Sequence, residues 1–172
     1  MPAKQNAIAL LKADHRKVAD LFEKDETARA KKADIAKQIC MELTIHTMIE
    51  EEIFYPACRE AGVESDKMDE ANVEHDGAKV LIGELENGSP GDEYYDAKVK
   101  VLSEEIKHHV KEEEQKGGIF ALARDAELDL DALGEQMAAR KKELLAAFEK
   151  DALPAPKTIT MSAPPLEHSA AA

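Results

Sequence analysis

Four stretches of this chain each place a histidine on the apolar side of a predicted helix. In the first stretch, apolar residues recur at intervals of three and four, and His15 takes the one polar position between Leu11 and Val18. Residues three and four apart share one face of an α-helix, so His15 is expected to point into the core. A chain that repeats this pattern must bury several imidazoles together, which limits the folds open to it.

The second and fourth stretches add a glutamate one helical turn after the histidine, and the third carries a histidine alone. Glu50 follows His46 by four residues, Glu113 follows His109 by four, and His75 lies in the third row. No Lys or Arg occurs in these rows. An ionised carboxylate is costly to bury unless its pKa shifts or a cation compensates its charge. A single core histidine needs no ligand, but this combined set favours a metal site.

Two adjacent histidines compete for the fourth position. His109 and Glu113 continue the apolar row at positions 99, 102 and 106, whereas His108 and Glu112 belong to a row that contains Glu105. We therefore favour His109 and Glu113 as ligands. His108 is assigned to a solvated face, or at most to the surroundings of the site. The other glutamates of the runs 50–52 and 112–114 are expected to lie on the solvated surface.

The chain is predicted to be all-α, an antiparallel up-down-up-down four-helix bundle with an additional C-terminal helix. The expected helices cover about residues 5–25, 32–61 and 65–87, a fourth that follows Ser89-Pro90 and ends at Gly117-Gly118, and a fifth at about 131–150. A serine followed by proline is typical of a helix start. The division is 1–125 for the bundle, 126–150 for the extra helix packing on it, and 151–172 for a flexible tail rich in Pro and Ala.

The composition excludes several classes of protein. A net charge of −13 argues against a nucleic-acid partner, because phosphate binding needs clustered Lys and Arg. No apolar run approaches the ~20 residues of a membrane helix, and the N-terminus lacks the layout of a secretory signal. Cys40 and Cys58 are too few for a disulfide framework and lie roughly 27 Å apart along one predicted helix. They are interpreted as small buried residues, with a thiol switch as the alternative, and a cytoplasmic location is the default expectation.

The kind of ligand narrows the choice of metal. Structural zinc usually has four ligands, often including cysteine, and calcium and magnesium prefer oxygen. The ferritin-like pattern uses Glu-x-x-His on two helices, and Glu105 with His108 is its one match here. A histidine-rich di-iron site therefore fits best. Ligand type alone leaves manganese or a mixed pair open.

These residues resemble the hemerythrin-like, or HHE cation-binding, domain over about residues 5–125. The resemblance also includes the segments 11–15, 50–56 and 108–114. It implies a four-helix bundle that holds two iron ions, joined by an oxo or hydroxo group. It further implies the following ligands: His15 and His46 for one iron, His75 and His109 for the other, and Glu50 and Glu113 bridging both.

One position departs from the family pattern. Oxygen-carrying hemerythrins have a second histidine one turn after the third-helix one, where this chain has Lys79. Each iron would then keep an open position. Tyr55 is a candidate to fill one, but it lies nine residues after His46, about 180° around an ideal helix. Tyr55 is therefore predicted to lie outside the site, unless the helix is distorted near Pro56.

Three functions remain open at this point. The first is a protein that binds O2 or NO as a scavenger, store or sensor, with a role in oxidative or nitrosative stress. The second is an oxidoreductase that decomposes peroxide or reduces NO. The third is a store or donor of labile iron. The expected partner is a diatomic gas or peroxide, and the excess positive charge of a ferric pair favours an anionic peroxide.

Overall fold

The computed structural model describes residues 5–28 and 30–162, and no strand occurs among them. The helices are α1 (Ala7–Thr27), α2 (Lys32–Ile49), the π-helix η1 (Glu50–Phe54), α3 (Tyr55–Glu60), α4 (Ser65–Glu86), α5 (Tyr95–Glu114), α6 (Ile119–Asp125) and α7 (Leu130–Phe148). The predicted all-α class is confirmed. None of the described helices combines the length and the apolar composition that crossing a bilayer requires.

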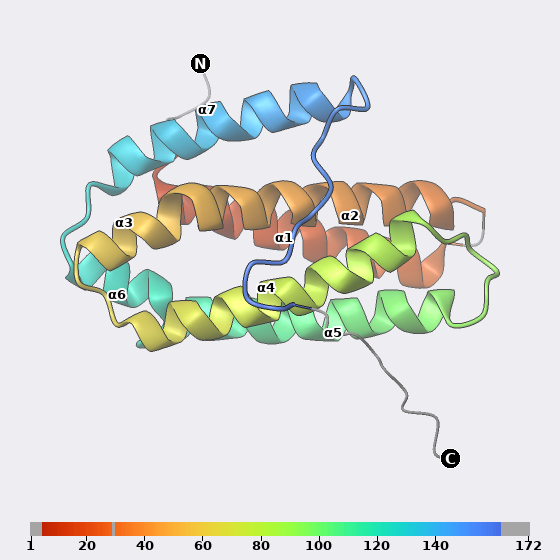
Figure 1. The fold of residues 1–172 in the computed structure, drawn as a ribbon, viewed down its shortest axis with the longest axis horizontal. Helices are drawn as coiled ribbons and strands as arrows, with labels where there is room; N and C mark the ends of the chain where they lie inside the picture. The colour runs from red at the N-terminus through yellow and green to blue at the C-terminus, as the bar shows by residue number, and fades with distance from the viewer. Residues whose placement is uncertain (1–4, 29, 163–172) are drawn as a thin grey trace, which may run out of the picture.

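Four long rods form the bundle (Figure 1). The helix α1 packs against α2 and α5, and α4 packs against the same two neighbours, which closes the four rods around one axis. The second rod continues without a break from α2 through η1 into α3, and α3 slopes away from the line of α2 (Figure 1). The additional helix α7 lies along α1 and α2 on the outside, as the sequence predicts for an extra C-terminal helix.

Local hydrogen bonds begin two of the helices. The side chain of Asn6 accepts from the Ala9 backbone N–H at 2.9 Å at the start of α1, and Asp129 accepts from the Ala132 N–H at 3.0 Å at the start of α7. Each bond satisfies a backbone donor that has no partner within its helix.

The predicted start of the fourth long helix at Ser89-Pro90 is wrong, because α5 begins at Tyr95. The Ser89 backbone N–H donates to the Asp92 carboxylate at 2.7 Å, and Gly91 has a φ of +105°. These features close a turn over residues 89–92 instead of starting a helix, since a φ in this range suits glycine and not a helix.

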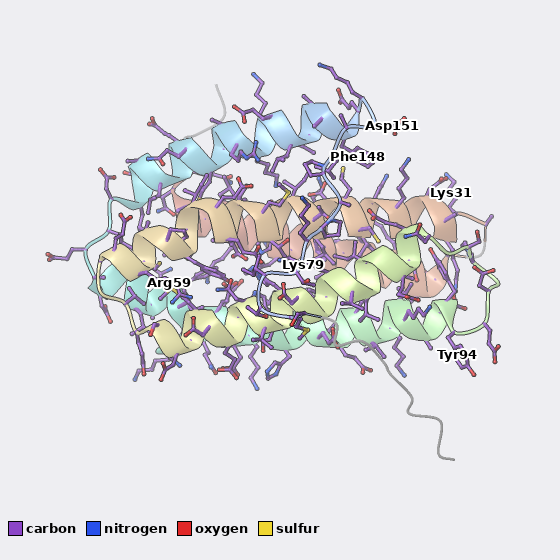
Figure 2. The ribbon with its side chains drawn as sticks, in the orientation of Figure 1. Lys31, Arg59, Lys79, Tyr94, Phe148 and Asp151 are labelled. Atoms are coloured by element: carbon purple, nitrogen blue, oxygen red, sulfur yellow. The ribbon has the colours of Figure 1, made fainter. Side chains whose placement is uncertain are left out.

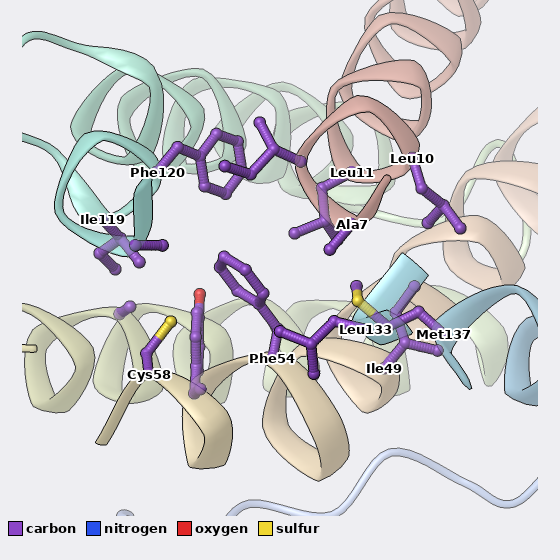
Figure 3. Close-up of a cluster of buried hydrophobic side chains, with 14 of the residues drawn as sticks. Ala7, Leu10, Leu11, Ile49, Phe54, Cys58, Ile119, Phe120, Leu133 and Met137 are labelled. Atoms are coloured by element: carbon purple, nitrogen blue, oxygen red, sulfur yellow. The ribbon is translucent and has the colours of Figure 1, made fainter. Parts of the chain in front are cut away.

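The buried apolar side chains form two clusters, one toward each end of the bundle. The first gathers around Phe54 and Phe120, where α6, α3 and α7 converge (Figure 3). The second gathers residues of α1, α2, α4 and α5 around Phe22, Ile82 and Leu102. The first cluster ends at Leu11 on α1 and the second begins at Val18, so position 15 falls between them. The polar residues of the site occupy this layer between two apolar blocks.

Beyond α7 the chain turns back across the bundle toward α4 (Figure 1). Residues 151–162 of the predicted tail are described, and they have no helical or strand structure. The rest of the predicted tail, 163–172, lies outside the described residues. The described part reaches Asp76 on α4 and makes several hydrogen bonds to it, a contact that the sequence does not indicate.

Candidate metal centre

The four rods bring all six predicted ligands into the layer between the apolar clusters. None of the six is more than 7% exposed, and the two glutamates are fully buried. Their ligand atoms form two groups in which all atoms lie within 4.8 Å of one another. The groups are His15, His46, Glu50 and Glu113 in the first, and Glu50, His75 and His109 in the second. Glu50 belongs to both groups, so two cation positions would share a carboxylate.

Glu50 lies between two imidazoles that come from different rods. Its Oε2 is 3.2 Å from His46 Nε2 and 3.3 Å from His75 Nε2. Its Oε1 has no hydrogen-bond partner among the described residues. One carboxylate therefore faces both halves of the site.

Glu113 occupies the corresponding place on the other side. Its Oε2 is 3.3 Å from His15 Nε2 and 3.6 Å from His109 Nε2. The Nε2 atoms of His75 and His109 are 3.1 Å apart. The Nε2 atoms of all four histidines thus point toward one small region between two carboxylates.

Every imidazole also has a carboxylate on its outer side, near Nδ1. The distances from Nδ1 to the carboxylate oxygen are 2.7 Å for His15–Glu114, 3.6 Å for His46–Asp14, 3.0 Å for His75–Glu51 and 2.7 Å for His109–Glu74. An Nδ1–H directed at a carboxylate leaves the Nε2 lone pair free to face inward. This orientation is the one that metal-binding histidines show in proteins.

Each outer carboxylate in turn contacts a basic side chain farther from the centre. These contacts are Glu114–Lys12 at 3.0 Å, Glu51–Lys79 at 2.7 Å, Glu74–His108 at 3.3 Å, and Asp14–Lys141. These four sets of imidazole, carboxylate and basic group, here called relays, surround the rings on their outer sides. Lys141 belongs to α7, so the extra helix contacts the surroundings of the site through Asp14.

This arrangement corrects the prediction for Glu51, which was expected on the solvated surface: its side chain is only 14% exposed and accepts a hydrogen bond from His75. Glu114 is exposed as predicted, but it also accepts a hydrogen bond from His15. The sequence signal was their place beside Glu50 and Glu113. Adjacent residues on a helix lie about 100° apart, which is enough to reach the outer edge of a ring on the neighbouring rod.

The surroundings shift the pKa values of the two inner glutamates in opposite directions. Burial and the neighbouring Glu113 carboxylate raise the pKa of Glu50 well above its usual value. Burial also acts to raise the pKa of Glu113, but the His109 and His15 imidazoles outweigh it and lower that pKa to about 2. Burial lowers the pKa of His46 to about 4, so its ring is neutral and its lone pair is available at neutral pH.

Several buried atoms of the layer have no partner, and they provide the test of whether a metal fits. His15 Nε2, both ring nitrogens of His46, Glu50 Oε1 and Glu113 Oε2 lack hydrogen bonds among the described residues. Unpartnered buried polar atoms are rare in proteins and each needs an explanation. These converge and are nitrogen and oxygen donors of the kind that iron accepts, so the residues fit a pair of cations.

Tyr55 lies inside the site, contrary to the prediction for an ideal helix, because the helix is distorted just before Pro56, the one exception that the sequence analysis allowed. Its hydroxyl donates to Glu113 Oε1 at 2.8 Å and lies 3.4 Å from Glu50 Oε2. The ring stacks on His75 at 5.6 Å between centroids. Burial and the charges of both glutamates raise the pKa of Tyr55 well above its usual value, so the phenol keeps its proton.

The π-helix η1 causes Tyr55 to face the site. It spans Glu50–Phe54 and ends directly before Tyr55. The Tyr55 backbone N–H bonds to the Glu50 carbonyl in an i→i+5 pattern. One π turn holds an extra residue, so later side chains rotate back by about 100°. Tyr55 therefore faces the centre while His46 and Glu50 keep their own orientation. The sequence has no simple signal for this insertion.

The sequence pattern favours His109 over His108 as a ligand, and the two side chains differ in exposure and in contacts. The side chain of His109 is 4% exposed and faces Glu113, whereas that of His108 is 61% exposed and contacts Glu74. His108 thus lies in the surroundings of the site. Lys79 points away from the centre, toward Glu51 and Asp76.

Space beside the imidazoles is small and mostly apolar. A cavity of about 10 Å³ touches all four histidines and is lined also by Val18, Leu43, Ile106 and Val110. A volume of this size holds about one water molecule. Only a small ligand can therefore approach the centre from this side without a rearrangement of the bundle.

Comparison with known proteins agrees with this geometry. A family model described as the hemerythrin HHE cation binding domain matches residues 6–117. The chain belongs to this family. Its fold is similar to the crystal structure of a hemerythrin HHE cation binding domain-containing protein from Mycobacterium kansasii, with a TM-score of 0.70 and 22% identity, covering 86% of this chain and 94% of that one. No curated protein matches the sequence significantly.

The HHE domain is a metal-binding helical domain, and the clusters of histidine and glutamate in this chain are the groups that could hold the cations. The match ends at residue 117, before α6 and α7. The helix that supplies Lys141 therefore lies outside the matched domain.

Proposed function

We propose that this HHE domain holds two iron ions bridged by an oxo or hydroxo group, and that the centre binds or reacts with O2, NO or peroxide. The observation that supports the proposal most is the orientation of the four imidazoles. Each directs Nδ1 to an outer carboxylate and Nε2 to a shared inner one. Iron bound there would supply redox chemistry and positive charge.

The proposed ligands divide as the two groups of atoms do. His15 and His46 would hold one ion, His75 and His109 the other, and Glu50 would bridge them with Glu113. Structural zinc would be satisfied by four ligands, which leaves the remaining imidazoles unexplained. The small apolar cavity supports a diatomic gas or peroxide over a larger substrate.

The first experiment is metal analysis of the purified protein, with spectra before and after addition of O2, NO or peroxide. We expect about two irons per chain and near-ultraviolet absorption from the bridged ferric pair. His109→Ala should lose metal, whereas His108→Ala should keep it, because His109 Nε2 faces Glu113 and His108 is largely exposed. Metal loss in His108→Ala alone would overturn the ligand assignment on α5.

A peroxide-decomposing oxidoreductase is the second candidate, and Tyr55 favours it. This buried phenol keeps its proton and donates to Glu113 inside the site. A positioned proton donor typically contributes about 10²-fold or more to a rate. If the centre turns over peroxide, Tyr55→Phe should slow consumption by about 100-fold while metal content stays unchanged.

The outcomes separate the three candidate functions. Sustained peroxide consumption supports the oxidoreductase, and reversible spectral change with O2 or NO without turnover supports a binding protein. Iron that leaves readily to a chelator, with no response to gas or peroxide, supports a store of labile iron. A protein that binds no iron refutes the proposal as a whole.

A further inference from the structure

The segment Thr158–Met161, here called the C-terminal strap, binds one carboxylate on α4. Asp76 accepts from the backbone N–H groups of Ile159 at 3.0 Å, Thr160 at 2.5 Å and Met161 at 2.9 Å, and from the Thr160 hydroxyl at 2.7 Å. The two partners are more than 80 residues apart in the chain. In Figure 1 the strap crosses α4 near the middle of the bundle.

Apolar burial does not hold the strap in place. The side chains of Ile159 and Met161 are 59% and 43% exposed. A cavity of about 840 Å³ opens beside the strap and is lined by Thr158, Lys157 and Lys79, among others. Since little apolar surface is removed from water, the hydrogen bonds to Asp76 are the main attachment of the strap.

Asp76 also connects the strap to the candidate metal centre. It is fully buried, and its Oδ1 accepts from Lys79 Nζ at 3.1 Å. Lys79 Nζ is 2.7 Å from Glu51, and Glu51 is 3.0 Å from His75 Nδ1. A continuous chain of polar contacts therefore runs from the strap to one proposed ligand. Figure 2 labels Lys79 where the strap crosses α4.

The relays behind the other three histidines end within helices. The basic groups behind His15, His46 and His109 are Lys12, Lys141 and His108, all of which belong to helices. The relay to His75 alone continues, among the described residues, into a segment without secondary structure. The His75 side of the centre thus depends on an attachment that can open without unfolding a helix.

We propose that the C-terminal strap is part of the support of the metal centre and that its docking on Asp76 is coupled to metal binding at the His75–His109 position. The docked strap completes the partners of Asp76, Asp76 fixes Lys79, and Lys79 holds Glu51 against His75. This inference rests on the proposed di-metal function. Coupling of this kind is reciprocal: metal at that position favours the docked strap, and the docked strap favours retention of that metal.

The first test measures metal release from the full-length, metal-loaded protein to an excess of chelator. Thr160→Pro removes two donors to Asp76, the backbone N–H and the hydroxyl, at an exposed position outside the core. Loss of a direct partner of a metal ligand typically weakens binding by about 10-fold or more, and Thr160 acts on His75 only through Asp76, Lys79 and Glu51. We therefore expect one of the two ions to leave several-fold faster and the other to leave at the normal rate.

Two further variants serve as the control and as an independent test of the same contact. Ile159→Ala is the matched control, because it keeps every backbone donor and changes a side chain that is already exposed. Asp76→Asn should reproduce the fast phase of Thr160→Pro from the other side of the contact. If each ion leaves Thr160→Pro at the same rate as it leaves Ile159→Ala, the coupling is overturned. This comparison holds whether or not Asp76→Asn is stable.

The second test uses the reciprocal effect on the strap. Trypsin cleaves after Lys157, directly before the strap, and after Lys150, which serves as an internal control. Metal-loaded protein should be cleaved after Lys157 several-fold more slowly than metal-free protein, with little difference after Lys150. The same rate after Lys157 in both states refutes the coupling. A chain that binds no metal refutes the proposed function itself, so the two failures are distinguishable.

Discussion

Replacing Tyr55 with phenylalanine isolates the hydrogen bond that the π-helix makes possible. The phenol donates to Glu113 Oε1 at 2.8 Å, and the ring is 1% exposed. Phenylalanine keeps the ring and its stacking on His75 but leaves a buried carboxylate oxygen without this donor. We therefore expect the metal-free protein to lose stability.

The magnitude follows from the kind of acceptor. A hydrogen bond to a charged group contributes about 1.5–3 kcal/mol, and the loss should be near this range because water does not reach the site. For a chain of this length, a loss of about 2 kcal/mol lowers Tm by about 4–8 °C. The assay is urea unfolding of metal-free protein, in which the midpoint should fall while the slope stays constant.

Tyr95→Phe is the matched control. The Tyr95 side chain is also buried, at 5% exposed, but its hydroxyl has no hydrogen-bond partner among the described residues. Its removal should change the free energy of unfolding by less than about 0.5 kcal/mol. If Tyr55→Phe and Tyr95→Phe have the same midpoint, the bond to Glu113 does not form in solution and the reasoning is refuted.

Three further predictions concern other parts of the molecule. Burial raises the pKa of Cys40 and of Cys58 to about 12, so both thiols are protonated at pH 8 and should react with a thiol reagent only after unfolding; rapid reaction of native protein would contradict this. Gly134→Ala places a Cβ within 2.4 Å of the backbone at the start of α1 and should cost about 1–3 kcal/mol, whereas Gly83→Ala meets nothing and should stabilise by about 0.5–1 kcal/mol in the same unfolding assay. Lys141→Met should lower metal affinity about 10-fold in a chelator competition, and unchanged affinity would show that α7 does not support the centre.

The bundle could be predicted from the sequence because it depends on local periodicity, and the family could be suggested because the motifs in these rows resemble the HHE domain. Intervals of three and four residues fix which side chains share a helix face, so the rows through His15, His46, His75 and His109 could be read without a structure. The structure brings these residues together. Local signals were weaker at helix ends: a serine followed by proline predicted a start at residue 89, but a turn closed by Asp92 delays α5 to Tyr95.

The surroundings of the site required the tertiary structure. Glu51 and Glu114 are ordinary charged helix residues in the sequence, and their pairing with histidines depends on how neighbouring rods pack. Lys141 enters the site only because α7 lies along α1 and α2. Contacts between distant segments follow from packing, and helix periodicity carries no information about them.

The sequence by itself determined an all-α chain with a layer of histidine and glutamate between apolar rows, because hydrophobic spacing is a property of one helix at a time. Only the tertiary structure decided that Tyr55 faces this layer, since a single π turn shifts every later side chain by about one residue. It also decided that the strap meets Asp76, across more than 80 residues of chain. Both depend on backbone hydrogen bonds whose partners the residue pattern does not specify.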